Sequence, residues 1–169
     1  MVGDVTISDL RARPHQADAV AERIWRAFWR RKGTPLKSIR DGLENFLEPD
    51  TRIPFALVAE HDGKACGNAL VIDNDEPARP ELTPWLAALW VDEAFRRQGI
   101  ATMLLQEAIK RSAALGVETL YLAARPTLRG FYSKLGWQPI EDGVGEGRLT
   151  VHRYNIPGAP RSVPSTMRL

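Results

Sequence analysis

The sequence predicts an α/β (α+β) protein with a single mixed, mostly antiparallel sheet of six to seven strands, a central parallel strand pair and about four flanking helices. Three observations lead to this expectation. Asp62-Gly63 separates two apolar runs, which is a strong hairpin signal. A helical pattern lies between the apolar runs 85–91 and 119–123, and a strand–helix–strand crossover implies a parallel pair. Two amphipathic helical patterns precede the hairpin.

The first fifty residues are expected to form one short strand and two helices. Residues 5–7 are rich in β-branched side chains, as strands are. The first helix has an apolar stripe at Ala17, Val20, Ala21, Ile24, Trp25 and Phe28. Pro35 suits a first helical position, and a second apolar stripe runs from there to Leu47.

The rest of the chain reads as strands joined by turns and two more helices. The expected strands are 54–61, 64–73, 85–91, 119–123, 137–140 and 149–154, with helices at 101–115 and 128–135 and loops at 73–80 and 142–147. Residues 1–155 are expected to form one domain. Residues 156–169 contain three prolines and little apolar content, so we expect a weakly ordered tail.

Net charge, apolar run length and cysteine content argue against several classes of protein. A net charge of +2 is near neutral and argues against a nucleic-acid partner. No apolar run approaches about 18 residues, so no membrane partner is expected. The single cysteine, Cys66, lies in an apolar strand and reads as a buried thiol in a reducing, cytoplasmic environment. No Cys/His cluster has metal-ligand spacing, so no metal is expected.

The loop between the strand at 85–91 and the next helix has the features of an anion site. The first N–H groups of a helix have no internal partner and carry the positive end of the helix dipole. Gly99 lets a phosphate approach the backbone closely, and Arg96 and Arg97 add positive charge. The alternative is a solvated connection with two surface arginines.

Two segments resemble the GCN5-related N-acetyltransferase (GNAT) family. Residues 96–101, Arg-Arg-Gln-Gly-Ile-Ala, resemble its Gln/Arg-x-x-Gly-x-Gly/Ala signature, including the strand before and the helix after. Tyr132 to Trp137 resembles the family's Tyr-x-x-x-Gly-aromatic motif. The two motifs stand in the family's order, and the resemblance covers roughly residues 54–155.

The resemblance implies a GNAT-like fold and acetyl-CoA as cosubstrate. The family splays its two parallel strands apart, and the cofactor's pantetheine arm lies in the gap. The backbone of the fourth strand is then expected to bind the pantetheine, and the loop amides and arginines the pyrophosphate. The implied cofactor-binding residues are Leu89, Val91, Arg96, Arg97, Gln98, Gly99, Ile100, Ala101 and Thr102.

Tyr132 is the implied catalytic residue. In the family, the tyrosine at this position faces the cofactor sulfur, where its hydroxyl can stabilise or protonate the departing thiolate. The alternative is a core tyrosine with a satisfied hydroxyl. Arg125 and Leu128 stand where many members have Asn and Ala, which puts the adenine-side contacts of this segment in doubt.

The sequence does not identify a general base, because the strand at 85–91 contains no acidic residue. The remaining candidates are better explained as surface or structural groups, so deprotonation through ordered water is expected. These candidates are Glu60, His61, Glu81 and His152. The alternative is that folding brings a carboxylate from another loop, such as Asp73 or Glu76, into reach. Trp85 and Trp90 belong either to the acceptor site or to the core.

The sequence therefore predicts an acetyltransferase that moves an acetyl group from acetyl-CoA to a primary amine, on a small molecule or a peptide, by direct attack in a ternary complex. One alternative is a protein N-terminal or lysine acetyltransferase, and another is a CoA-binding regulatory module without catalysis. A third is a nucleic-acid-binding domain that uses the basic residues of the first helix. A solvated helix face explains those residues, Arg23, Arg26, Arg30, Arg31 and Lys32, more simply. A homodimer is left open.

Overall fold

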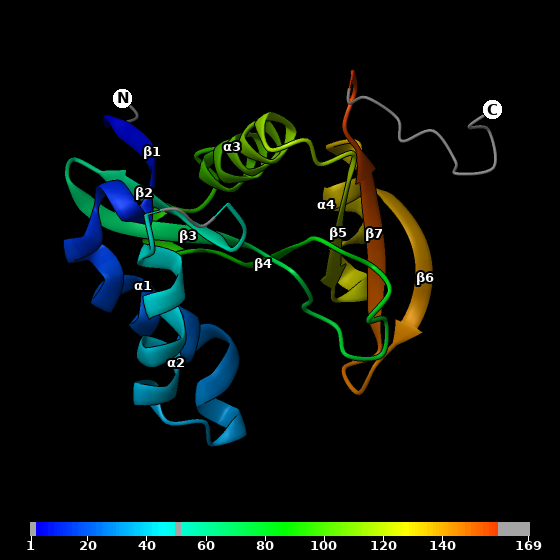
Figure 1. The fold of residues 1–169 in the computed structure, drawn as a ribbon, viewed down its shortest axis with the longest axis horizontal. Helices are drawn as coiled ribbons and strands as arrows, with labels where there is room; N and C mark the ends of the chain where they lie inside the picture. The colour runs from blue at the N-terminus through cyan, green and yellow to red at the C-terminus, as the bar shows by residue number, and fades with distance from the viewer. Residues whose placement is uncertain (1–2, 50–51, 159–169) are drawn as a thin grey trace.

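The computed structural model describes residues 3–49 and 52–158 (Figure 1). It contains a seven-stranded sheet with the strand order β1-β2-β3-β4-β5-β7-β6. Among these strands, β4 and β5 run parallel and the other neighbours are antiparallel. The predicted mixed sheet with one parallel pair is confirmed.

The elements follow the predicted order. The strands are β1 (Val5–Asp9), β2 (Phe55–His61), β3 (Lys64–Ile72), β4 (Trp85–Val91), β5 (Thr119–Ala124), β6 (Gln138–Val144) and β7 (Leu149–Asn155). The α-helices are α1 (Ala17–Ile24), α2 (Leu36–Leu43), α3 (Ile100–Ala114) and α4 (Arg129–Lys134).

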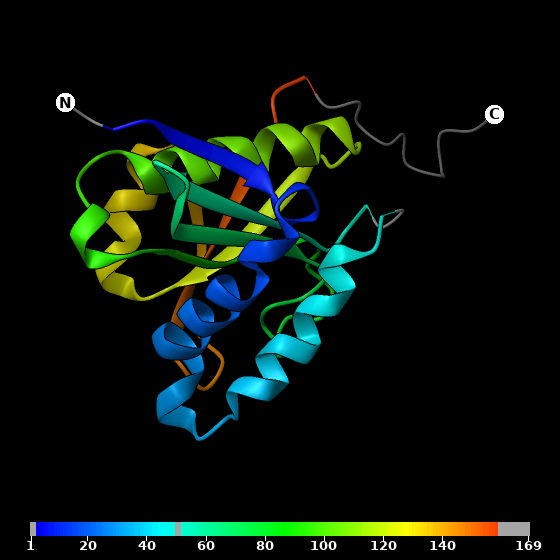
Figure 2. The ribbon, with the colours of Figure 1, turned by 90° about the vertical axis from the view of Figure 1, so that its left-hand side faces the viewer.

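Helices cover both faces of the sheet, and each face has its own core. Figure 2 shows α1 and α2 on one face and α3 on the other. Leu104 and Leu105 of α3 and Tyr132 of α4 pack in one cluster, whereas Val20 of α1 and Leu43 of α2 pack in the second. The sheet is thus buried on two sides, which explains why its central strands are almost continuously apolar.

The parallel pair opens immediately after it forms. Trp85 opposite Tyr121 is the one registered pair between β4 and β5, and the Tyr121 N–H donates to the carbonyl of Pro84 at 3.1 Å. Beyond this point the two strands diverge, and Figure 1 shows β4 and β5 running in clearly different directions. The rest of β4 therefore has one edge that no described strand covers.

A bulge interrupts β4 just before this open edge. Asn68 pairs with Trp90 but Leu70 pairs with Ala87, so β4 has one residue more than β3 here. Ala88 takes a positive φ of 50°, and its carbonyl accepts a 2.8 Å hydrogen bond from the buried Asn68 side chain. The bulge re-aims the last residues of β4, as bulges beside active sites commonly do.

The first helix differs from its prediction. The α-helix ends at Ile24 and continues as a π-helical turn over Trp25–Trp29. The π-turn adds a residue to the turn and so rotates the side chains that follow. Phe28 was expected in the buried stripe, but it is 38% exposed.

The last hairpin, formed by β6 and β7, also differs from its prediction. The sequence predicted a loop over 142–147, but β6 continues through Asp142 and Gly143 to Val144 with an irregular register against β7. Gly143 has a φ of 67°, a conformation that permits such an irregularity. Of the expected tail, Ile156 packs in the core and its N–H donates to the carbonyl of Glu118 at 2.8 Å, while 159–169 lie outside the described residues.

The long connection between β3 and β4 is fixed to the far hairpin. Arg79 makes a double hydrogen-bonded ion pair with Glu141 of β6. The buried Glu76 carboxylate lies against Gly145, where an added Cβ would be 2.6 Å from either oxygen. These contacts tie the two halves of the sheet together beside the gap between β4 and β5.

Candidate active site

The open edge of β4 presents backbone hydrogen-bonding groups to the gap. The Asp92 N–H donates to the carbonyl of Cys66 on the β3 side at 2.8 Å. Because backbone groups of successive strand residues point to opposite sides, those of Leu89 and Val91 face the gap. An extended ligand that lies in the gap can pair with them like an added strand.

The loop after β4 supplies a group of free amides. Arg97 and Gly99 take φ values of 64° and 77°, and α3 starts at the next residue. The first amide that bonds back into the helix is Met103, which donates to the carbonyl of Gly99 at 3.0 Å. Within the described chain, the N–H groups of residues 97–102 have no backbone acceptor. This arrangement suits an anion.

The side chains of this loop are placed differently from one another. Arg97 and Gln98 are exposed, whereas the Ile100 side chain is in the core, so only its backbone is available. Ala101 and Thr102 are half-buried. Arg96 folds back, because its Nε donates to the carbonyl of Val91 at 2.9 Å and its guanidinium lies 4.6 Å from the centre of the Trp90 ring.

A long-range ion pair holds the start of this loop. Arg23 of α1 forms two hydrogen bonds of 2.8 and 2.9 Å to the Asp92 carboxylate and one to the carbonyl of Ala65. The Arg23 side chain is 9% exposed, so its expected place on a solvated helix face is wrong. The pairing crosses 69 residues of sequence, and no local pattern could have revealed it.

Tyr132 is held in an aromatic cluster on α4. Its ring contacts those of Phe131, Trp137 and His152, with centroids 5.0, 6.4 and 5.4 Å away. Burial raises the pKa of Tyr132 to about 12. Its hydroxyl has no hydrogen-bond partner among the described residues, which leaves it free to donate to a ligand.

His152 is sealed beneath Tyr132 on β7. It is fully buried, and neither ring nitrogen has a hydrogen-bond partner among the described residues. This burial lowers the pKa of the imidazole, so the ring stays neutral at physiological pH.

The other candidate bases are not arranged for proton transfer. Glu60 is 2% exposed and accepts two 2.8 Å hydrogen bonds from Arg13, and these hydrogen bonds lower the pKa of its carboxyl. His61 pairs with Asp62 and packs on a phenylalanine ring, while Glu81 is exposed on the connection before β4.

The two candidate tryptophans lie in different environments. Trp85 is completely buried, with its indole N–H bonded to the carbonyl of Leu82 at 2.5 Å, so it belongs to the core. Trp90 is half-buried and contacts Phe28 and Arg96. Cys66 is a buried thiol, as expected.

Exposed side chains surround Tyr132 in the sequence, and they include Leu128 and Arg125, the two positions where the chain departs from the family pattern. Leu128 and Phe131 are 43% and 40% exposed. Arg125 is exposed at the end of β5. Exposed apolar side chains of this kind are suited to contact with an apolar part of a ligand.

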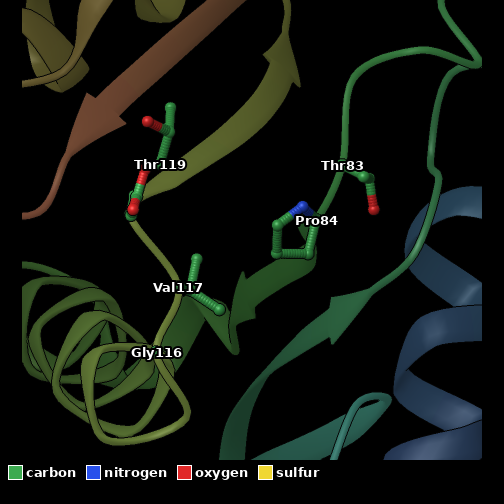
Figure 3. A pocket seen from close by; sticks show the side chains of 6 residues that line it. Thr83, Pro84, Gly116, Val117 and Thr119 are labelled. Carbon is green, nitrogen blue, oxygen red and sulfur yellow. The ribbon is translucent and has the colours of Figure 1, made fainter. Parts of the chain in front are cut away.

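A separate surface hollow lies away from this site. Its volume is about 340 Å³, and it is lined by Thr83, Pro84, Gly116, Val117, Glu118 and Thr119. Figure 3 shows these residues on the segments that precede β4 and β5. The hollow is at the opposite end of β4 from the free amides and contains none of the predicted site residues. In the described chain no group of His, Cys, Asp and Glu could hold a metal, and no helix could span a membrane.

Comparisons with known proteins agree with this geometry. The profile of the acetyltransferase (GNAT) family matches residues 17–137. An acetyltransferase of the GNAT family from Streptococcus pneumoniae superposes with a TM-score of 0.67 at 15% identity, over 90% of this chain and 99% of that one. An acyl-CoA N-acyltransferase from Pseudomonas aeruginosa gives 0.64 at 21% identity, over 89% and 98%. An aminoglycoside 6'-acetyltransferase type Ii gives 0.68 at 21% identity, over 93% and 99%. No curated protein matches the sequence.

Proposed function

The chain belongs to the acetyltransferase (GNAT) family, and from this premise we propose that it transfers an acetyl group from acetyl-CoA to a primary amine. The observation that carries the proposal is the continuity of the site. The gap-facing backbone of Leu89 and Val91 leads directly into the free amides of residues 97–102. A thioester cofactor with a polar amide arm and a pyrophosphate needs both features in this order.

The predicted cofactor-binding residues other than Arg96 each have a contact with the cofactor in this proposal. The backbone groups of Leu89 and Val91 bind the pantetheine, with the Val91 carbonyl already accepting from Arg96. The amides of residues 97–102 bind the pyrophosphate, and the exposed Arg97 adds its charge. Gly99 keeps the approach clear, because a Cβ there would have no protein atom within 4 Å.

Tyr132 acts on the leaving group in this proposal. The amine nitrogen attacks the thioester carbon, a C–N bond forms and the C–S bond breaks, while the nitrogen loses a proton to water. The Tyr132 hydroxyl donates a hydrogen bond to the sulfur as negative charge develops on it. With a pKa of about 12, this tyrosine stays protonated and remains a donor throughout.

The backbone of the bulged strand completes the site. Its amides near Leu89 stabilise the negative charge that develops on the carbonyl oxygen. The Asn68 side chain holds the Ala88 carbonyl at 2.8 Å and so fixes the direction of these amides. We place the protein in the cytoplasm, where acetyl-CoA and reduced thiols are available.

A test is acetyl-CoA-dependent release of thiol, measured across a panel of small amines and peptides. We expect release with at least one acceptor, and a product heavier than that acceptor by one acetyl group in mass spectrometry. Tight acetyl-CoA binding without transfer to any acceptor would instead favour the CoA-binding regulatory module.

A further inference from the structure

We propose that the acceptor is the α-amine of an aromatic amino acid, either free or at the N-terminus of a peptide. This inference rests on the proposed function and gives it a substrate class. It is based on Phe28 and Trp90, which we name the aromatic wall, and on the charges and proton acceptors around them.

The aromatic wall stands next to the reacting part of the site. Phe28 and Trp90 pack edge to face, with centroids 5.8 Å apart and ring planes at 80°. Trp90 lies between Leu89 and Val91, whose backbone groups face the proposed thioester. Leu89 and Val91 pack in the α3 core, so alternation along the strand puts the Trp90 ring on the α1 face of the sheet. A ring bound at this wall is one residue away from the reacting carbonyl.

The wall is built by a departure from regular structure. A continuous helix would have put Phe28 four residues after the buried Ile24, on the same face. The π-turn over Trp25–Trp29 rotates Phe28 away from the core and onto Trp90. π-turns within helices are frequent at functional sites. A phenylalanine that is 38% exposed and already oriented by a second ring can pack another aromatic ring at low entropic cost.

The charges near the wall select against polycations. The Arg96 guanidinium lies 4.6 Å from the Trp90 ring centre, and that of Arg30 lies 5.5 Å from the ring of Trp25. Neither arginine forms an ion pair with a described residue. The positive charge of Arg96 beside the Trp90 ring repels a polyamine and attracts the carboxylate or carbonyl oxygen that every amino acid carries beside its α-amine.

The absence of a dedicated base also favours an α-amine, most of all one at the N-terminus of a peptide. Glu60 is bound to Arg13, and His152 has no solvent-accessible nitrogen. An acceptor must therefore arrive partly neutral. At pH 7 about one in ten chain-terminal α-amines is neutral, against about one in a few thousand alkyl amines. Transfer forms the C–N bond, breaks the C–S bond, returns one proton to the thiolate and releases one from the nitrogen to water.

The test compares acceptors that differ in one feature each. Thiol release is measured with L-phenylalanine, the peptides Phe-Gly-Gly and Ala-Gly-Gly, phenethylamine and spermidine, and acetyl-CoA affinity is measured by calorimetry. We expect kcat/KM for the better of the two phenylalanine acceptors to exceed that for Ala-Gly-Gly and spermidine by about 10-fold or more. The ratio of L-phenylalanine to Phe-Gly-Gly then tells which source supplies the α-amine.

Matched variants locate the preference at the wall. Phe28→Ala should bring kcat/KM for the phenylalanine acceptors to within about twofold of that for Ala-Gly-Gly. Phe28→Leu keeps apolar bulk at this exposed position and should also reduce the preference. Trp29→Ala is the control, because Trp29 is 40% exposed and packs under Lys32 rather than against Trp90. Acetyl-CoA affinity should be the same in all three variants.

Two results would overturn the inference while leaving the proposed function intact. One is equal or better transfer to Ala-Gly-Gly, phenethylamine or spermidine. The other is an aromatic preference that survives both Phe28 substitutions in folded protein. Failure to acetylate any acceptor, with acetyl-CoA still bound, would reject the transferase proposal and this inference together.

Discussion

Tyr132 and His152 lie ring to ring, yet burial pushes their pKa values in opposite directions. Desolvation raises the pKa of the phenol to about 12 and lowers that of the imidazole. Both groups are therefore neutral at pH 7, because burial disfavours the charged form of either. The neutral Tyr132 hydroxyl can donate a hydrogen bond near a developing thiolate, and the neutral ring of His152 beneath it adds no charge to the apolar side of the site.

We expect Tyr132→Phe to lower turnover roughly 10- to 1000-fold, around the range for loss of one oriented donor. Acetyl-CoA affinity should change little, because the hydroxyl acts as the sulfur departs. Tyr121→Phe removes a hydroxyl from a half-buried tyrosine that packs on Trp85, and it should keep wild-type turnover. Single-turnover kinetics compares the two, and wild-type turnover in the Tyr132 variant would remove this residue from the mechanism.

We expect Gly99→Glu to abolish measurable acetyl-CoA binding, because it places a negative side chain among the amides of residues 97–102. Gly116→Glu is the control at the other end of α3. Gly116 has a φ of 84° against 77° for Gly99, and neither position has a protein atom within 4 Å of an added Cβ. Calorimetric titration of the two folded variants should separate the electrostatic effect from the backbone strain they share. Equal affinities would refute the pyrophosphate site.

His152 predicts how stability depends on pH. The pKa of His152 is lowered in the folded protein. As the pH falls, the unfolded chain therefore binds the proton first, because its histidine has the ordinary pKa of about 6.5. The stability that the neutral ring contributes is present above about pH 6.5 and is lost as the pH falls below it. Thermal unfolding between pH 7.5 and 5 should show this loss, and His152→Leu should weaken it. Protonation of Glu60 and Asp142, whose pKa values are lowered, begins in a more acidic range.

At the level of elements, the contact between the β3–β4 connection and the β6–β7 hairpin can be tested with two glycines. Gly145→Ala would put a Cβ 2.6 Å from the Glu76 carboxylate oxygens, at a φ of 71°. We expect it to destabilise the fold by about 2–4 kcal/mol. Gly143→Ala has a similar φ of 67° but an open Cβ position, so it should cost only about 1–2 kcal/mol.

Chemical denaturation measures both variants, and their difference isolates the Glu76 contact. Adding Glu76→Ser to Gly145→Ala should recover part of the loss, because the shorter side chain makes room for the methyl group. If the two alanine variants are equally stable, the connection is not packed tightly against the hairpin.

The elements were predictable wherever local pattern decides structure. The Asp62-Gly63 hairpin, the apolar runs of the central strands and the amphipathic α3 all formed where the sequence placed them. The π-turn after Ile24 was missed, because apolar spacing alone does not distinguish a wide turn from a regular one. The extension of β6 was missed because glycines 143, 145 and 147 predicted a loop, although an irregular strand also accepts Gly143.

At the scale of the whole molecule, the pH dependence of the reaction should follow the acceptor rather than a protein base. We expect Glu60→Gln, Glu81→Gln, His61→Ala and His152→Ala each to retain a substantial fraction of activity. The rate should rise with pH along the acceptor's own titration and shift with its pKa. A folded variant of these four that binds acetyl-CoA but loses activity a thousandfold would identify a dedicated base.

Only part of the candidate site could be predicted from the sequence. The loop of residues 96–101 and Tyr132 could be found because each belongs to a short contiguous motif. The pairing of Arg23 with Asp92 and the contact of Phe28 with Trp90 join residues more than 60 positions apart. Such contacts depend on how α1 packs against the end of β4, and helix packing is not encoded in any single segment.

The uncovered edge of β4 has a consequence for handling the protein. Unpaired strand edges template association with other chains, and natural proteins usually shield them. A ligand that pairs with this edge binds the folded state alone, and at one hundred times its Kd it adds about 2.7 kcal/mol to the free energy of unfolding. We therefore expect preparations free of CoA to scatter more light on storage and to melt at lower temperature than preparations supplied with it. On this expectation, the ligand that fills the open edge also limits association between copies of the chain.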